Sequence, residues 1–222
     1  MQSIIFAGGK GTRMGELTRD IPKPLLNLQG KPILNYVLES LPQKIDQVII
    51  VVGYLGEKIK NYFGKFYNDL PIEYVEQDNK MPGTGGALWS AQNLINNEKF
   101  LVLNSDDIHS LEFLTQMTNK SLAYGVIHKE WDGYLSVLAD ANGNLCDFTI
   151  QDGNKSVTTG VYTLDKRIFK YEPFLTRNQE YSLPRTVLKM AQEYPIELVY
   201  SDFFISINTP ADLKKVEQLI CS

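Results

Sequence analysis

The pattern of apolar and polar residues in the first half of the chain predicts strands that alternate with helices. Short apolar runs, typical of buried parallel strands, occur at residues 2–6, 47–52, 72–75 and 100–103. Apolar residues at helical spacing, or glycines that open onto such a stretch, predict helices at 31–41, 56–66 and 83–94. This alternation indicates βαβ units, so we expect an α/β fold with a Rossmann-like, mostly parallel central sheet and helices on both faces.

The second half of the chain is richer in predicted strands, which cover residues 123–128, 134–139, 144–150, 156–164 and 203–207. An Asn-Gly pair at 142–143 marks a hairpin turn. One helix is expected at 183–193, and Thr209 is expected to cap a final helix that has Pro210 at its first position. There is no internal repeat, low-complexity segment or linker, so residues 1–222 are expected to form one domain.

Composition narrows the class of protein. Hydrophobic residues make up 43% and charged residues 22% of the chain, as in an ordinary globular domain. The formal net charge of −4, without a basic stretch, argues against nucleic acid as a partner. Cys146 and Cys221 lack metal-ligand spacing. No leader peptide precedes the first strand and no apolar run reaches membrane-spanning length, so we expect a cytoplasmic protein without a membrane partner.

The segment after the first strand carries the candidate chemistry. It reads Ala7-Gly8-Gly9-Lys10-Gly11-Thr12-Arg13-Met14, and Lys23 follows between two prolines. Glycines let backbone N–H groups approach phosphate oxygens, and Arg13 and Lys23 add positive charge, so the segment predicts a polyphosphate site. It is not a P-loop, because Lys10 is followed by Gly11, and the dinucleotide fingerprint fails at Met14.

This segment and Pro22-Lys23-Pro24-Leu25 resemble the signature of the sugar-1-phosphate nucleotidyltransferases, Ala-Gly-Gly-x-Gly-Thr-Arg-Leu followed by Pro-Lys-Pro-Leu. The resemblance extends over nearly the whole chain. It implies a nucleotide-binding core at residues 1–110 and a smaller, β-rich sugar-binding lobe at 111–222. It also implies two partners, a nucleoside triphosphate and a sugar 1-phosphate, whose oxygen attacks the α-phosphorus while pyrophosphate leaves. The oligomeric state is left open.

The resemblance assigns roles around the triphosphate. Arg13 corresponds to the arginine that grips the triphosphate, and Lys23 to the lysine that contacts the α-phosphate and the sugar phosphate. Both are expected to be catalytic, because the meeting of two anions needs positioning and neutralisation of charge. The nucleotide is expected to bind along the glycine-rich segment at Ala7, Gly8, Gly9, Gly11 and Thr12.

A metal ligand is implied at Asp106, which matches the aspartate of the family's Gly-Asp motif, although Ser105 stands in place of the glycine. The implied cofactor is Mg²⁺, which bridges phosphate oxygens and offsets their charge. Asp107 is expected to point elsewhere. His109 is expected to be a polar surface residue, because an ionised phosphate needs no catalytic base.

Base recognition is implied for Gln77 and for a segment that includes Gly83 and Thr84. A glutamine amide both donates and accepts hydrogen bonds, so it can pair with the N3–H and O4 edge of uracil or thymine, and this favours UTP or dTTP. Guanylyl-transferring relatives share the Gly-Thr-Gly-Gly-Ala pattern, so a GTP-dependent mannose- or heptose-1-phosphate guanylyltransferase is an alternative. Cytidylyl transfer and guanylyl transfer to a cofactor are further ones.

Sugar binding is implied for Thr159 and Gly160, which resemble the family strand that lies along the sugar. Trp131, Asp132 and Tyr134 can also line a sugar-binding face, although aromatic residues in strands more often belong to a core.

Two departures from the family pattern concern charged groups. Ile150 and Gln151 replace a Glu-Lys pair, and Lys155 is nearby but off register. Ser206 replaces the aspartate that is the family's second metal ligand. Asn208 lies on the same strand face, about 7 Å along, and is the expected substitute. These departures leave open a second class of function, a catalytically weak homologue that binds a nucleotide sugar and regulates a partner, whereas the intact glycine-rich segment, Arg13, Lys23 and Asp106 favour an active transferase.

Overall fold

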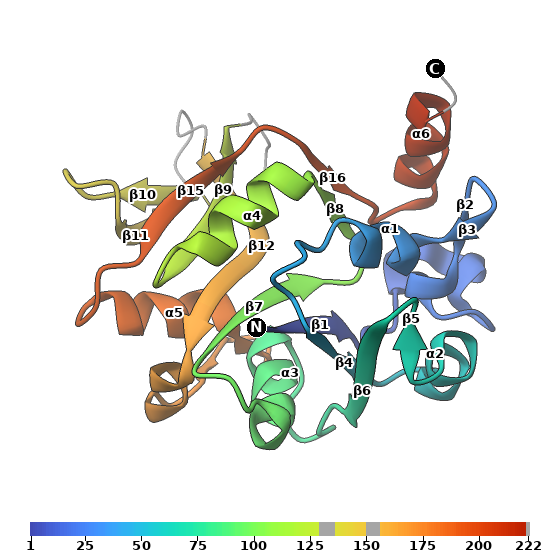
Figure 1. The fold of residues 1–222 in the computed structure, drawn as a ribbon, viewed down its shortest axis with the longest axis horizontal. Coiled ribbons are helices and arrows are strands. Elements are labelled where there is room, and N and C mark those ends of the chain that lie inside the picture. Colours follow the sequence, from blue (N-terminus) through green and yellow to red (C-terminus); the bar gives the residue numbers. More distant parts are fainter. Residues whose placement is uncertain (129–135, 150–155, 221–222) are drawn as a thin grey trace.

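The computed structural model describes residues 1–128, 136–149 and 156–220. Within these residues a ten-stranded mixed sheet runs through the molecule in the order β11-β10-β12-β7-β1-β4-β6-β5 (Figure 1). β9 joins this sheet by pairing with β12, and β15 pairs with β9. The expected α/β fold is confirmed.

The centre of the sheet is parallel, as predicted. β1 (Gln2–Ala7) lies between β4 (Gln47–Val52) and β7 (Lys99–Asn104), and β6 (Leu70–Glu76) extends the parallel part beyond β4. The carboxyl ends of these strands therefore meet along one edge, where the loops that follow them can form a binding site.

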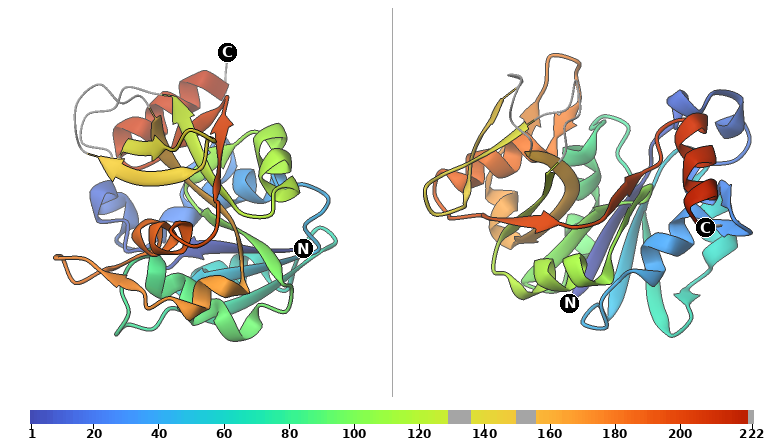
Figure 2. Two further views of the ribbon diagram at one scale, coloured as in Figure 1. Left: turned by 90° about the vertical axis from the view of Figure 1, so that its left-hand side faces the viewer. Right: turned by 90° about the horizontal axis from the view of Figure 1, so that it is seen from above.

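Helices cover both faces of the sheet (Figure 2). On one face, α3 (Thr84–Ala91) and α5 (Leu183–Ala191) pack over a core that contains Ile4. On the other face, the core that contains Ile5 is covered by α1 (Ile33–Glu39), α2 (Gly56–Phe63) and α4 (Leu111–Asn119). Successive residues of β1 thus serve opposite cores, which explains its continuous apolar run.

Several helices are shorter than predicted, and each has a local cause. α1 begins at Ile33 because β3 (Lys31–Pro32) pairs with β2 (Asn27–Leu28). α2 ends before Gly64, which has a φ of 62°, and β5 (Phe66–Tyr67) then pairs with β6. α3 passes into a 3-10 turn at Gln92–Leu94.

The second half is mainly antiparallel. β12 (Ser156–Asp165) pairs antiparallel with β7, with β9 (Ala123–His128) and with β10 (Ser136–Ala139). β10 and β11 (Leu145–Thr149) form the hairpin predicted from the Asn-Gly turn. β15 (Glu197–Ser201), which pairs in parallel with β9, and α4 were not predicted.

The end of the chain returns to its beginning. β16 (Phe204–Ser206) pairs antiparallel with β8 (Asp107–His109), and α6 (Pro210–Ile220) follows, beside β2 and β3 (Figure 1). The predicted cap is present, because the N–H of Asp212 donates to Oγ1 of Thr209 at 3.2 Å. A small core fixes this contact and includes residues from both ends of the chain, namely Met14, Leu26, Leu28, Ile207 and Val216.

A short hairpin, β13 (Phe174–Leu175) and β14 (Tyr181–Ser182), reaches back to the first half of the chain. The N–H of Tyr181 donates to the carbonyl of Pro82 at 2.7 Å, and the N–H of Leu183 donates to Oγ1 of Thr84 at 3.1 Å. The hairpin thereby forms part of the edge at which the parallel strands end. In the described part of the chain, no helix has the length and apolarity needed to cross a membrane.

Candidate functional site

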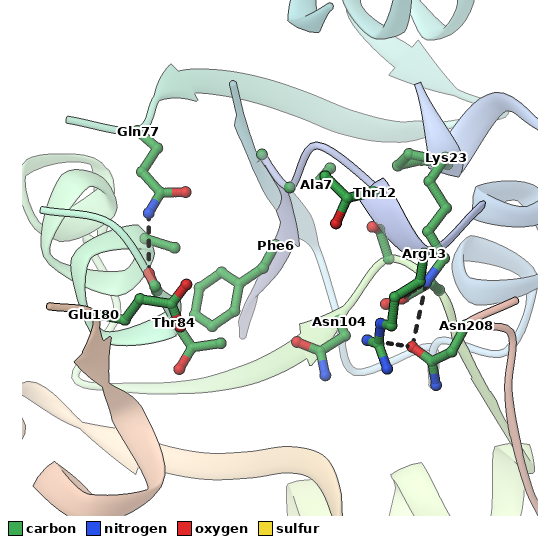
Figure 3. Close-up of a pocket in the computed structure, with 18 residues that line it drawn as sticks. Phe6, Ala7, Thr12, Arg13, Lys23, Gln77, Thr84, Asn104, Glu180 and Asn208 are labelled. Carbon is green, nitrogen blue, oxygen red and sulfur yellow. Dashed lines mark hydrogen bonds and ion pairs between the residues drawn. The ribbon is translucent and has the colours of Figure 1, made fainter. Parts of the chain in front are cut away.

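A cleft lies at the carboxyl ends of the parallel strands. Its central cavity has a volume of about 400 Å³. Two further cavities, of about 850 Å³ and 580 Å³, share lining residues with it on either side. Figure 3 shows the central cavity, with Gln77, Thr84 and Glu180 at one end and Arg13, Lys23 and Asn208 at the other. Among the described residues, each nucleotide, phosphate, metal or sugar contact assigned from the resemblance lines at least one of the three cavities.

The glycine-rich segment forms the wall between the central cavity and the 850 Å³ cavity. Gly8 is packed so closely that a Cβ there would lie 2.8 Å from Oε1 of Gln77. Gly11 has a φ of 64° and its carbonyl accepts from Oγ1 of Thr18 at 3.0 Å. The left-handed φ favours glycine at position 11, whereas a Cβ on Gly8 would displace the end of the Gln77 side chain. Ala7 and Thr12 line the central cavity beside the loop.

Arg13 and Lys23 lie close together, with Asn208 between their charged groups. Nη2 of Arg13 donates to Oδ1 of Asn208 at 2.8 Å, and Nζ of Lys23 is 3.5 Å from the same oxygen. Lys23 is only 9% exposed and forms an ion pair with Asp106. Its prolines start a 3-10 turn that points the lysine into the cleft, so the surface role that a lysine usually has does not apply.

Asp106 and Asn208 have the donor chemistry of a site for a hard cation. A carboxylate and an amide oxygen both approach one positive group, the ammonium of Lys23. Nδ2 of Asn208 donates to Oγ of Ser206 at 2.7 Å, which fixes the amide so that its oxygen faces Lys23. Among the described residues no group of three His, Cys, Asp or Glu side chains is arranged as a metal site. The set fits Mg²⁺, which takes few protein ligands and shares phosphate oxygens with its substrate.

Asp107 also faces the cleft, although we expected it to point elsewhere. It lines the 580 Å³ cavity, and its Oδ2 accepts from Nδ2 of Asn104 at 2.8 Å. Burial, followed by the charge of Asp106, raises the pKa of Asp107 to about 7, and the side chains of Ser206 and Asn104, as hydrogen-bonding neighbours, and the charge of Lys23 partly offset this.

His109 is not a surface residue, so that expectation was wrong. It is 3% exposed, because β8 turns it inward between the rings of Phe113 and Phe204, whose centroids lie 5.5 Å and 5.3 Å away. Burial lowers the pKa of His109 to about 3. Its role is therefore packing, without a charge at neutral pH.

Gln77 lies at the opposite end of the cleft, with its amide already engaged. Nε2 donates to the carbonyls of Met81 at 3.1 Å and Gly83 at 2.9 Å. Two carbonyl partners fix the orientation of the amide, so Oε1 is the atom left for a ligand. Glu180, carried by the hairpin of β13 and β14, lines the same end. No sequence motif pointed to it, because the contact depends on the docking of that hairpin.

Thr159 and Gly160 lie at the third cavity, on the irregular part of β12. Gly160 has a φ of 74°, and a Cβ there would lie 2.4 Å from Nδ2 of Asn104. The hydroxyl of Thr159 is buried, with no hydrogen-bond partner among the described residues. A Cβ on Gly125 would lie 2.5 Å from Oγ1 of Thr159, so the hydroxyl is tightly packed against that glycine. The residues predicted to flank the sugar or replace the Glu-Lys pair lie outside the described residues: Trp131, Asp132, Tyr134, Ile150, Gln151 and Lys155.

Comparison with known proteins covers most of the chain. The family model described as nucleotidyl transferase matches residues 2–193. The chain is 30% identical over 226 residues to the D-glycero-alpha-D-manno-heptose 1-phosphate guanylyltransferase of Campylobacter jejuni, covering 96% of each protein. It is 29% identical to the bifunctional protein GlmU of Methanococcus vannielii, covering 96% of this chain and 53% of that protein.

The fold has counterparts among solved structures. A UDP-glucose pyrophosphorylase complexed with UDP-glucose superposes with a TM-score of 0.85 at 21% identity, covering 99% of this chain and 98% of that one. The similarity confirms the fold, including the Rossmann-like arrangement of the central sheet, which carries the cleft at the carboxyl ends of its strands.

Proposed function

The chain belongs to the nucleotidyl transferase family, as a sugar-1-phosphate nucleotidyltransferase, and we propose that it transfers GMP from GTP to a sugar 1-phosphate. In this reaction an oxygen of the sugar phosphate forms a bond to the α-phosphorus, and the bond from that phosphorus to the β-phosphate oxygen breaks. The products are a GDP-sugar and pyrophosphate. The observation that carries the proposal is the group of Arg13, Lys23, Asp106 and Asn208 beside the glycine-rich segment.

Charge neutralisation is the proposed task of Arg13 and Lys23. Both substrates are anions, so the main obstacle to the reaction is their mutual repulsion and the charge that develops on the leaving pyrophosphate. Arg13 is exposed to the cleft and offers a planar fork of donors, which suits a triphosphate. Lys23 is buried and held beside Asp106, which suits a single fixed contact at the reacting phosphate.

A divalent cation is the proposed cofactor, and Mg²⁺ is the ion that we propose. Asp106 and Asn208 would hold it, since their oxygens face the same point in the cleft. When bound, such a cation offsets the negative charge of the phosphate oxygens. The 2.8 Å hydrogen bond from Arg13 orients the Asn208 amide.

GTP is proposed over UTP and dTTP for two reasons. The argument for a pyrimidine assumed that the Gln77 amide both donates to the base and accepts from it. In the structure, Nε2 of Gln77 already donates to the backbone carbonyls of Met81 and Gly83. Oε1 accepts equally from a guanine or a uracil N–H, so the choice rests on the relatives. The relative matched along 96% of its length is a guanylyltransferase, whereas GlmU is matched along 53%.

The third cavity is the proposed sugar site. It begins at Arg13 and Asp106 and extends along Thr158–Gly160 of β12, so it lies next to the proposed phosphate site. Its lining includes hydroxyl, amide and carboxylate groups, which suit a polyhydroxylated ligand. A heptose or mannose 1-phosphate is the proposed substrate.

The test is release of pyrophosphate with Mg²⁺ present, using five nucleotides crossed against a panel of sugar 1-phosphates: GTP, UTP, dTTP, CTP and ATP. We expect fastest release with GTP and a heptose or mannose 1-phosphate, and none with the matching sugar 6-phosphates. Faster turnover with UTP or dTTP would overturn the choice of base. If the protein bound nucleotide and no pair reacted, the result would favour a regulatory homologue.

A further inference from the structure

Asp106 and Asp107 are consecutive carboxylates in very different surroundings. Asp106 forms an ion pair with Lys23, whereas no ion-pair partner of Asp107 is found in the part of the chain that the structure describes. Asp107 is 5% exposed, and its Oδ1 is buried without a hydrogen-bond partner among these residues. A buried carboxylate oxygen in this condition is unfavourable. The site therefore leaves a place for a donor or a cation at Asp107.

The register of two strands places Asp107 beside the candidate cation ligands. Asp107 of β8 is directly opposite Ser206 of β16. Directly opposed residues of an antiparallel pair project their side chains to the same face. Oγ of Ser206 accepts from Nδ2 of Asn208 at 2.7 Å, and Asn208 shares the Lys23 ammonium with Asp106. A series of neighbouring oxygen-bearing groups thus runs from Asp106 to Asp107.

The second carboxylate changes what the site can hold. Asp106 and Asn208 alone offer one negative charge, and Lys23 already neutralises it. A hard divalent cation binds more tightly as the number of charged oxygen ligands rises. Asp107 is the other carboxylate that lines the 580 Å³ cavity in the described part of the chain. Its Oδ2 accepts a hydrogen bond from Asn104, which leaves Oδ1 as the oxygen without a hydrogen-bond partner among the described residues.

We propose that Asp107 is the second acidic ligand of the divalent cation, together with Asp106 and the amide oxygen of Asn208. The proposal rests on the proposed function, in which the cation serves nucleotidyl transfer. A competing role, in which Asp107 accepts a hydrogen bond from a hydroxyl group of the sugar, uses the same cavity. The two differ in one respect: only the proposed role makes cation affinity depend on Asp107 when no sugar is present.

The test measures binding of Mn²⁺, as a spectroscopic substitute for Mg²⁺, by electron paramagnetic resonance. The protein is mixed with a non-hydrolysable GTP analogue and no sugar. Asp107→Asn should raise the Mn²⁺ dissociation constant by about 10- to 100-fold. Adding Ser206→Asp to that variant should recover most of the affinity, because the register places the new carboxylate beside the lost one.

The control variant is Asp202→Asn, which removes an exposed carboxylate near the same strand and should leave the Mn²⁺ affinity unchanged. Thermal melting of each variant confirms that it is folded. An unchanged affinity in Asp107→Asn, or a loss that appears only after sugar 1-phosphate is added, would overturn the proposal. Because no turnover is measured, a failure of the proposed function would show separately, in the pyrophosphate assay.

Discussion

Arg13 and Asn208 lie 195 positions apart in the chain, and Nη2 of Arg13 donates to Oδ1 of Asn208 across 2.8 Å. The contact exists because β16 pairs with β8, and because α6 packs against the segment that contains Met14. The phosphate loop and the end of the chain therefore form one site. We propose two tasks for Arg13 there, to bind phosphate and to orient a proposed cation ligand.

Replacing Arg13 with alanine should lower kcat/KM for the nucleotide by about 100-fold or more, because it removes charge stabilisation worth a few kcal/mol. Steady-state kinetics with the preferred pair of substrates measures the effect. Arg19→Ala is the matched control: Arg19 is exposed and pairs with Glu16 on the surface, so its loss should change the rate by about twofold at most. Equal effects of the two substitutions would contradict the role of Arg13.

Replacing Asp106 with alanine should lower the rate by about 100-fold or more and abolish saturation by Mg²⁺ in the ordinary range. Its carboxylate is the charged partner of Lys23 and the first proposed ligand of the cation. A titration of activity against Mg²⁺ concentration reports both effects. A rate within a few-fold of the unmodified enzyme would mean that the metal assignment is wrong.

Gly160→Ala should weaken sugar 1-phosphate binding as well as the fold. The residue has a φ of 74°, which costs alanine about 1 kcal/mol, and the new Cβ would meet Nδ2 of Asn104 at 2.4 Å. Gly143→Ala is the control, because Gly143 has a φ of 81° and nothing within 4 Å of a Cβ. We expect similar strain in both and loss of sugar affinity, by equilibrium binding, only in Gly160→Ala. A matched loss of affinity in both variants would contradict this account.

His109→Phe should leave the protein at least as stable as before at pH 7. Neither ring nitrogen of His109 has a hydrogen-bond partner among the described residues, so a buried polar group is left unsatisfied. Replacing such a group with an apolar ring removes a desolvation cost of about 1 kcal/mol or more. Crowding from the larger phenyl ring offsets part of this gain. Urea denaturation measures the free energy of unfolding. A loss of several kcal/mol would show that His109 makes an essential polar contact.

Much of the fold could be predicted from local sequence. The parallel strands β1 and β4 are short apolar runs, and the turn between β10 and β11 has an Asn-Gly pair, so both were predicted correctly. α4 and β15 were missed. The buried apolar residues of α4, Phe113, Leu114 and Met117, recur at helical spacing, so this helix has a local signal. β15 owes its place to pairing with β9, a long-range contact that no local pattern reports.

The candidate site divides in the same way. The glycine-rich segment, Lys23 and Asp106 are recognisable because their motifs are contiguous. Glu180 and the pairing of Asp107 with Ser206 arise from hairpin docking and strand register, which the sequence does not display. Gln77 was predicted to contact the base, and it does line the cleft. Its amide nitrogen, however, donates to two backbone carbonyls, which no sequence pattern indicates.

The central claim is that an oxygen of the sugar phosphate attacks the α-phosphorus of the nucleotide. Sugar 1-phosphate labelled with ¹⁸O in its phosphate tests this directly, with products identified by mass spectrometry. The account predicts a nucleoside diphosphate sugar that keeps the whole label, unlabelled pyrophosphate in equal amount, and almost no product from the Asp106→Ala variant. Labelled pyrophosphate, or no nucleotide sugar with any pair of substrates, would contradict it.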